Sequence, residues 1–346
     1  MRTFALAVIL ITLGLLPAYA QEGPKTPITF STINWCAKPY IDDNGAATKS
    51  WAAAQFETQS FSNISEVHKQ YISETCNDLS GRPQLGHFWR GLADYFKTSK
   101  AWDKNQERIS AYRKAMPKDP QAPILEATYW IAYAWDARGS GYASSVSADG
   151  WKHFRERLEK AKKVLEDSKS YASTNPEWYM EMLIVQAALD APQRVRDATF
   201  VEGVGKYPWY LPLYFTRAEY LAPWWGGDWD SIENLSLWSV KQTKAKMGNT
   251  MYARIYWAIS HAESVKNLFK DTKASWPTMK SGFDDMMRQF PESNRNLNAY
   301  ARFACDAGDK ETYLKLRKKL AGKALDDSLW GTKHHEVCDV KFGYKI

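Results

Sequence analysis

Apolar residues recur every three to four positions along most of the chain, which is the period of an amphipathic helix. The stretch 61–75 shows this spacing, and the stretch 150–168 shows it with charged residues on the opposite face. The stretch 248–265 repeats the pattern through Met251 and Ile255. Alternation of apolar and polar residues, which marks half-buried strands, is nearly absent. We therefore predict an all-α fold with little or no sheet.

Two kinds of marker divide this helical pattern. Four prolines each follow an amphipathic stretch and precede an aromatic-rich one, namely Pro120, Pro176, Pro208 and Pro291. Four tryptophans stand near the start of charged helices, namely Trp102, Trp151, Trp229 and Trp276. Helical hairpins that bury their faces by stacking on neighbours produce such repeats. We predict a tetratricopeptide-like solenoid of helical hairpins, wound as a right-handed superhelix. Because the spacings are irregular, chance placement of the prolines remains an alternative.

A corner between two helices is predicted around the sequence APWWGGDWD. A helix that begins near Leu211 should end at Ala222, because Pro223 disfavours helical geometry in the residue before it. Gly226 and Gly227 provide a sharp turn, and we expect one of them to adopt a positive φ angle.

The next helix should begin just after this turn. Asp230 is followed three residues later by Glu233, which predicts a capping box. Chain reversal requires neither Trp224 nor Trp225. Both tryptophans are therefore candidates for contact with a ligand.

The chain begins with the features of a secretory signal peptide over residues 1–20. A basic residue, Arg2, precedes the apolar run 4–16 and a small-x-small cleavage site. We expect residues 21–50 to form an irregular N-terminal arm and residues 51–346 to form a single helical-repeat domain. No later stretch is apolar enough to span a bilayer. These features predict a periplasmic or secreted protein without a membrane span after cleavage.

Four cysteines follow the signal peptide, namely Cys36, Cys76, Cys305 and Cys338. An even number in an exported protein predicts two disulfides, although four cysteines allow three pairings. Because the cysteines cluster toward opposite ends of the chain, we favour Cys36 with Cys76 and Cys305 with Cys338. The rival interpretation is a metal site, for which His334 and His335 lie close to Cys338 in sequence. We expect no metal and no cofactor.

The charge and the motifs narrow the function classes. The formal net charge is +7, without a cluster of lysine and arginine, and an exported protein rarely meets nucleic acid, so we expect no nucleic-acid partner. No nucleophile elbow, phosphate loop or zinc-protease motif occurs. Six carboxylates are candidates for glycoside hydrolysis, namely Glu126, Asp136, Glu177, Glu181, Glu219 and Asp228. Glu177 and Glu181 are one helical turn apart, and we interpret them as part of a solvated face.

Four strings carry a resemblance to a known family. They are YAWDARGSGYA (133–143), EYLAPWWGG (219–227), GNTMYARIYW (248–257) and ARFACDAGD (301–309). Over roughly residues 50–340 the chain resembles the bacterial exported family catalogued as Domain of Unknown Function 4034. That resemblance implies a tetratricopeptide-like helical fold. It implies no catalytic residues, because the family has no established activity.

Three segments place an aromatic side chain beside a charged one, and together they predict a ligand-binding groove. The candidate residues are Asp136, Arg138, Tyr142, Trp224, Trp225, Arg254, Trp257 and His261. The last three share one helix face, which differs from the apolar stripe of Met251 and Ile255. The first three lie in or next to the glycine-rich loop before Trp151. The alternative is that all these aromatic residues pack between hairpins.

These patterns together predict an exported helical-repeat scaffold. It would bind an unknown protein or peptide partner in a concave groove of aromatic and charged residues, without catalysis. One alternative is a glycan or cell-wall binding protein, because tryptophan and tyrosine faces stack on sugar rings. Another is an all-helical hydrolase built as an α/α toroid. A toroid closes on itself and an open solenoid does not, so the overall shape separates these two architectures.

Overall fold

The computed structural model describes residues 34–37, 41–262, 264–331 and 333–345. The predicted signal peptide lies outside these residues. Within them the chain forms seventeen α-helices, and the only bridge of β type joins Asn77 and Pro83. The prediction of an all-α fold is therefore confirmed. No helix in the described ranges is both long enough and apolar enough to cross a membrane.

The helices follow one another with short connections. The first nine are α1 (Ala46–Glu57), α2 (Phe61–Tyr71), α3 (Gln84–Ser99), α4 (Trp102–Ala115), α5 (Gln121–Arg138), α6 (Ala148–Ala172), α7 (Pro176–Ala188), α8 (Gln193–Lys206) and α9 (Leu211–Leu221). The others are α10 (Trp229–Met247), α11 (Thr250–Ile259), α12 (Leu268–Asp271), α13 (Trp276–Gln289), α14 (Asn294–Asp306), α15 (Lys310–Leu320), α16 (Asp327–Trp330) and α17 (His334–Phe342). Two short 3₁₀ turns, η2 (Ala143–Ser145) and η3 (Pro223–Trp225), lie between them.

Five of the eight proline and tryptophan markers lie at helix starts. Pro176 is the first residue of α7, and Pro120 directly precedes α5. Trp102, Trp229 and Trp276 are the first residues of α4, α10 and α13. Proline suits the first turn because its missing N–H has no partner there in any helix. These five markers therefore report where helices begin.

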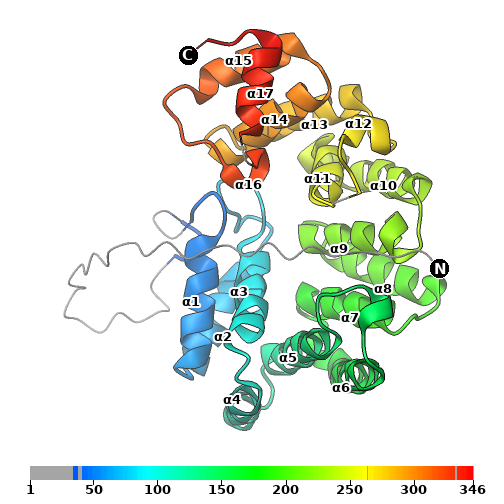
Figure 1. The fold of residues 1–346 in the computed structure, drawn as a ribbon. Helices are drawn as coiled ribbons and strands as arrows, with labels where there is room; N and C mark the ends of the chain where they lie inside the picture. The colour runs from blue at the N-terminus through cyan, green and yellow to red at the C-terminus, as the bar shows by residue number, and fades with distance from the viewer. Residues whose placement is uncertain (1–33, 38–40, 263, 332, 346) are drawn as a thin grey trace.

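The helices pack in sequence order along an arc. Neighbours such as α5 and α6, α7 and α8, and α14 and α15 are in contact. A second series of contacts links α5 to α7, α7 to α9, α9 to α11 and α11 to α13. Figure 1 shows these helices as a curve, with α1, α2 and α3 opposite its inner side. The inner side of the arc therefore faces the first helices of the same chain.

Contacts between distant parts of the chain join the two sides. The Asp43 carboxylate accepts hydrogen bonds from the Ser293 hydroxyl and the Arg295 backbone N–H, both at 2.6 Å. The backbone carbonyl of Ser80 accepts from the Asn296 side chain at 3.1 Å and from the Arg254 guanidinium. The segment before α3 is thereby bound to both α11 and α14. The described chain closes on itself at this point.

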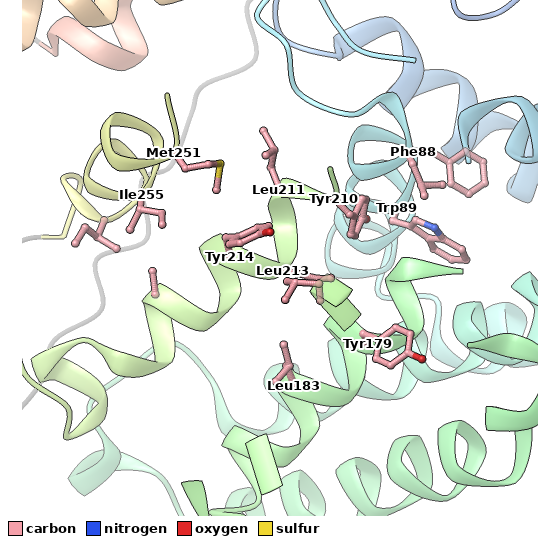
Figure 2. Packing of buried hydrophobic residues seen from close by; sticks show 14 of the residues in the cluster. Phe88, Trp89, Tyr179, Leu183, Tyr210, Leu211, Leu213, Tyr214, Met251 and Ile255 are labelled. Atoms are coloured by element: carbon pink, nitrogen blue, oxygen red, sulfur yellow. The ribbon is translucent and has the colours of Figure 1, made fainter. Parts of the chain in front are cut away.

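Large buried aromatic side chains fill the space between α3 and the arc. Trp89 on α3 and Tyr179 on α7 are both almost completely buried, as is Tyr210 just before α9. Figure 2 shows these residues in one cluster, which continues through Tyr214 to Met251 on α11. Burying each such side chain contributes on the order of 2–3 kcal/mol. The core thus holds the first helices against the arc.

The N-terminal arm is shorter than predicted. We expected irregular structure to residue 50, but α1 begins at Ala46. The Asp42 carboxylate accepts hydrogen bonds from the backbone N–H groups of Asn44, Gly45 and Ala47, and so it satisfies donors at the start of the helix. Our prediction was based on hydrophobic periodicity, which does not detect a helix start fixed by a polar side chain.

The corner agrees with the prediction in its turn and differs in its cap. Helix α9 ends at Leu221, and Gly226 has φ +82°. The capping residue of α10 is Asp228, whose carboxylate accepts from the Ser231 N–H at 2.6 Å. The predicted capping box at Asp230 is therefore wrong, because α10 begins earlier, at Trp229.

Asp230 and Glu233 have other partners. Asp230 forms an ion pair with Lys273, and Glu233 accepts a hydrogen bond from the Tyr252 hydroxyl at 2.9 Å. Tyr256 donates a second hydroxyl to the same carboxylate oxygen. Both acids therefore attach α10 to later parts of the chain, whereas a capping box would have used them within α10.

Both disulfides have the predicted pairing. Cys36 is bonded to Cys76, and Cys305 is bonded to Cys338. The first ties the segment before α1 to the segment before α3, and the second ties α14 to α17. Disulfides of this kind are typical of proteins in oxidising compartments.

Candidate functional site

A pocket of about 640 Å³ lies where α3 faces the arc, and we call it the central pocket. Its polar lining consists of four arginines, one histidine, one threonine and one carboxylate, namely Arg82, Arg90, Arg254, Arg295, His261, Thr216 and Glu219. Its larger apolar and aromatic lining residues are Ile184, Phe215, Tyr220, Trp257 and Ile259. These residues come from α3, α7, α9, α11 and α14 and from the turns next to α3 and α11. The pocket therefore exists only because the first helices fold back onto the arc.

Arg254 lies deepest among the four arginines. Its residue exposure is 3%, and its Nη2 donates to the Ser80 carbonyl. Burial lowers the pKa of Arg254 to about 10, so the guanidinium still carries its charge at neutral pH. Its Nε–H is buried and has no hydrogen-bond partner among the described residues. No carboxylate in the described ranges lies within ion-pair distance of it, unlike the other three arginines of the pocket.

Arg295, on α14, lies beside Trp257. The guanidinium carbon of Arg295 is 5.3 Å from the centre of the Trp257 ring, which is a cation–π distance. Its Nη1 donates to the Asp326 carboxylate at 2.7 Å, whereas its buried Nε–H has no partner among the described residues. Burial lowers the pKa of Arg295 from its ordinary value. One face of Trp257 is thus covered by a positive charge.

Asp78 organises the turn that supplies Arg82 and Ser80. Its carboxylate accepts from the Ser80 N–H at 2.8 Å, from the His87 ring at 2.8 Å and from Arg82 Nε at 3.1 Å. Burial would raise the pKa of Asp78, but the hydrogen bond from His87 and the charge of Arg82 hold it well below its usual range. The ionised carboxylate therefore fixes the turn whose carbonyl reaches Arg254.

The paired tryptophans of the corner hold Glu219 at the pocket. Trp224 Nε1 donates to Glu219 Oε1 at 2.7 Å, and Trp225 Nε1 donates to the same oxygen at 3.0 Å. The Trp225 ring contacts the Tyr220 ring with centroids 4.8 Å apart. The corner thus orients one carboxylate and one aromatic ring of the pocket wall, which gives Trp224 and Trp225 a positioning role there.

The glycine-rich segment lies at a different place. The Arg138 guanidinium stacks on Trp135 and Trp151 at 5.5 and 5.7 Å, and Asp136 pairs with Lys100 at 2.8 Å. Tyr142 is exposed. None of Asp136, Arg138 and Tyr142 is among the described residues that line the central pocket.

One ring contact links this segment to the corner. The centroid of Trp135 lies 6.2 Å from that of Trp225. The predicted groove set therefore lies in three places. Arg254, Trp257 and His261 line the central pocket, Trp224 and Trp225 hold Glu219 without lining the pocket themselves, and the glycine-rich segment lies apart from it. His261 lies just beyond α11, which ends at Ile259.

Sequence patterns did not predict five residues of the pocket lining, namely Arg82, Arg90, Arg295, Phe215 and Tyr220. Phe215 and Tyr220 lie on the helix that leads into the corner. Their closeness to Trp225 in the sequence could therefore have marked them as candidate pocket residues. The arginines carry no local signal. They meet because the turn around Ser80 crosses to α11 and α14.

Glu177 and Glu181 are buried, and the interpretation as a solvated face is wrong. Their exposures are 1% and 3%, because α7 turns this face toward the interior. The Tyr210 hydroxyl donates to Glu177, and Thr128 Oγ1 donates to Glu181 Oε1 at 2.5 Å. Burial raises the pKa of Glu181 to about 7, and burial together with the neighbouring Glu181 charge raises the pKa of Glu177. Two acids that hold protons near neutral pH therefore lie in the core.

A cysteine–histidine cluster near the C-terminus matches the rival metal hypothesis only in composition. Potential ligand atoms of Cys305, His334 and Cys338 lie within 4.8 Å of one another. The two sulfurs are bonded to each other, so neither is the thiolate that a metal requires. His334 Nε2 instead lies 2.9 Å from the Asp306 carboxylate.

No family model matches this chain, and neither a curated protein nor a solved structure matches it. The resemblance to Domain of Unknown Function 4034 therefore stays a prediction.

Proposed function

We propose that this protein is an exported helical-repeat scaffold that binds a peptide segment of a protein partner in the central pocket. The observation that carries the proposal is the convergence of Arg254, Trp257 and Phe215 in one pocket of about 640 Å³. That volume is within the range of about 300–1,000 Å³ that ligand sites occupy. Arginine and large aromatic residues are the side chains that dominate binding energy at interfaces.

The chemistry of the wall suits a peptide. Guanidinium groups donate to carbonyl and carboxylate oxygens, and the rings of Phe215 and Trp257 offer apolar surface to side chains. Two disulfides support a periplasmic or secreted location. The packing of successive helix pairs along the arc supports a tetratricopeptide-like solenoid, as the resemblance to Domain of Unknown Function 4034 also implies.

Site-specific photocrosslinking tests this function. A photoreactive phenylalanine analogue replaces Phe215 or Ala258, both in the pocket wall, and in a matched control it replaces Leu237, which is exposed on α10. We expect the two pocket positions to crosslink the same envelope protein, at the same peptide, and Leu237 not to do so. Trp257→Ala should abolish the crosslink while the thermal midpoint stays within a few degrees.

Equal crosslinking from Leu237, or different proteins from the two pocket positions, would refute a defined peptide site. A synthetic copy of the crosslinked peptide should then quench the fluorescence of the wild-type protein on titration. Quenching by cell-wall oligosaccharides and not by the peptide would instead support the glycan-binding alternative, in which Trp257 stacks on a sugar ring.

The contact between the first helices and α14 closes the described chain on itself, which favours the α/α-toroid architecture of the alternative hydrolase function. Glycoside hydrolysis needs a pair of carboxylates, one on each side of the scissile bond. Glu219 is the carboxylate among the described lining residues, and two indole N–H groups already occupy one of its oxygens. The peptide-binding function therefore fits the pocket better than hydrolysis does.

A further inference from the structure

We propose that the central pocket recognises a carboxylate group, with Arg254 as its charged anchor. The proposal rests on the proposed function, because it takes the bound peptide as the source of the carboxylate. It differs from that function in naming the chemical group that the pocket selects. It is supported by the unsatisfied Nε–H of Arg254, by the ion pairs of the other pocket arginines, by the charge of Glu219 and by the neighbouring aromatic surface.

Arg254 has hydrogen-bonding capacity that the protein does not use. A guanidinium has five N–H donors, and the described bond of Arg254 joins Nη2 to the Ser80 carbonyl. Its Nε–H is buried without a partner among the described residues, although the residue is 97% buried and lines the pocket. Buried donors on charged groups are normally satisfied, so this one needs a partner. An anionic oxygen would supply both the acceptor and the opposite charge.

The other arginines of the pocket already have carboxylate partners. Arg82 pairs with Asp78 at 3.0 Å and Arg90 with Asp94 at 2.9 Å. Arg295 pairs with Asp326 at 2.7 Å. Among the four arginines that line the pocket, Arg254 is thus the one without a carboxylate partner in the described part of the chain. One such charge matches a ligand group that carries a single negative charge.

Glu219 makes a group with two negative charges less suitable. Its carboxylate lies in the same wall, held by Trp224 and Trp225. Glu219 repels any anion in the pocket, and it repels a phosphate dianion about twice as strongly as a carboxylate, which carries half that charge. The charge balance therefore favours a carboxylate over a phosphate.

Aromatic surface stands next to this charge. Trp257 is one helical turn from Arg254 on α11, and Phe215 and Ile184 line the same pocket. A carboxylate that is attached to an apolar side chain fits this combination. N-acetyl-phenylalanine has both features, and its amide has nearly the same shape but carries a neutral carboxamide in place of the carboxylate.

Isothermal titration calorimetry of the full chain with N-acetyl-phenylalanine tests the proposal. We expect measurable binding that weakens at least roughly tenfold with N-acetyl-phenylalanine amide, since hydrogen bonds to charged groups are worth about 1.5–3 kcal/mol. Arg254→Gln should weaken the binding by a similar factor, and Arg254→Lys should restore part of it. Arg108→Gln, at a buried arginine that does not line the pocket, should leave it unchanged.

Equal binding of acid and amide would overturn the proposal, as would tighter binding of inorganic phosphate or of phenyl phosphate. If Arg254→Gln does not fold, as judged by circular dichroism, the comparison of acid with amide on the wild-type chain still decides the matter. A second pair of probes separates the sources. An apolar peptide with a free C-terminus should bind more tightly than its amide if the terminal carboxylate is recognised, and an internal Glu should substitute for it if a side chain is recognised.

The small probe separates this inference from the proposed function. Binding of the probe without any crosslinked partner would refute the scaffold function and keep the carboxylate site. A crosslinked peptide that binds equally well without any carboxylate would refute the carboxylate site and keep the scaffold function.

Discussion

Arg254 on α11 donates a hydrogen bond to the backbone carbonyl of Ser80, 174 positions earlier in the chain. Asn296 on α14 donates to the same carbonyl at 3.1 Å. One peptide group thus connects three separate parts of the fold. The pocket wall and the closure of the described chain depend on the same turn, so changes at this turn affect the site and the stability together.

Removal of either disulfide should destabilise the protein by about 4 kcal/mol in the chain-entropy model. The two disulfides, Cys36–Cys76 and Cys305–Cys338, close loops with sequence separations of 40 and 33. Each loop lowers the conformational entropy of the unfolded chain. Urea unfolding of the Cys36→Ala/Cys76→Ala and Cys305→Ala/Cys338→Ala variants measures the loss. Wild-type protein with reductant should match a variant in which all four of these cysteines are replaced by alanine. Unchanged urea midpoints would contradict this prediction.

Alanine at the corner glycines should lower stability by on the order of 1–2 kcal/mol. Gly226 has φ +82°, and a Cβ on Gly227 would lie 1.9 Å from the Leu221 carbonyl oxygen. Gly205→Ala on α8 is the matched control, because a Cβ there meets no atom within 4 Å. We expect that control to be neutral or slightly stabilising in thermal unfolding. A corner variant as stable as the control would show that the turn tolerates side chains.

Loss of the Asp228 cap should cost about 1 kcal/mol, as is typical for N-cap removal. Asp228→Ala leaves the Ser231 N–H without its acceptor, whereas Asp230→Ala removes only an exposed ion pair with Lys273. Exposed pairs contribute at most about 1 kcal/mol and often nothing measurable. Chemical denaturation should therefore rank Asp228→Ala as the less stable variant. The opposite ranking would restore Asp230 as the capping residue.

Glu181 should make stability fall as pH rises. Its pKa is about 7 in the folded protein and near its ordinary value of 4.5 in the unfolded chain. Between these values the folded state holds the proton that the unfolded state has released, so raising the pH favours unfolding. Below the unfolded value both states are protonated and the effect vanishes.

Glu181→Gln removes this titration and keeps a group that accepts from Thr128. The variant should gain on the order of 3 kcal/mol relative to wild type between pH 4.5 and 7.5. Glu166→Gln, at an exposed position of α6, controls for the lost charge. The test is the difference in unfolding free energy between variant and wild type across that pH range. A difference that does not change with pH would show that Glu181 is ionised throughout.

Local patterns were sufficient for the helices and the cysteine pairing. The end of α9 at Leu221 follows from Pro223, and the starts of α4, α10 and α13 coincide with the marked tryptophans. Such features depend on neighbours in sequence, so the sequence alone indicates them. The cap at Asp228 was missed because Asp230 has Glu233 three positions later and so fits the capping-box motif, whereas Asp228 has Ser231 there.

The pocket depended on contacts that no local pattern contains. Arg82 and Arg295 line one cavity because the turn around Ser80 reaches α14, and nothing near either residue indicates this. Glu177 and Glu181 have the spacing of an exposed acidic face, yet α7 turns that face toward α5, the start of α9 and the core. Side-chain identity and spacing show which residues share a helix face. Which face is covered is decided by the tertiary fold.

The hydrogen bond between Asp43 and Ser293 spans 250 positions, which has a consequence for the order of folding. Closing so long a loop is entropically costly, and contacts of large sequence separation slow folding. A ribosome makes residue 43 long before residue 293. Helices α1 to α3 therefore lack their contacts with α11 and α14 while the arc is synthesised. During that interval the aromatic face of α3 around Trp89 is open to other molecules. The oldest part of the nascent chain is therefore the part that most needs protection from aggregation.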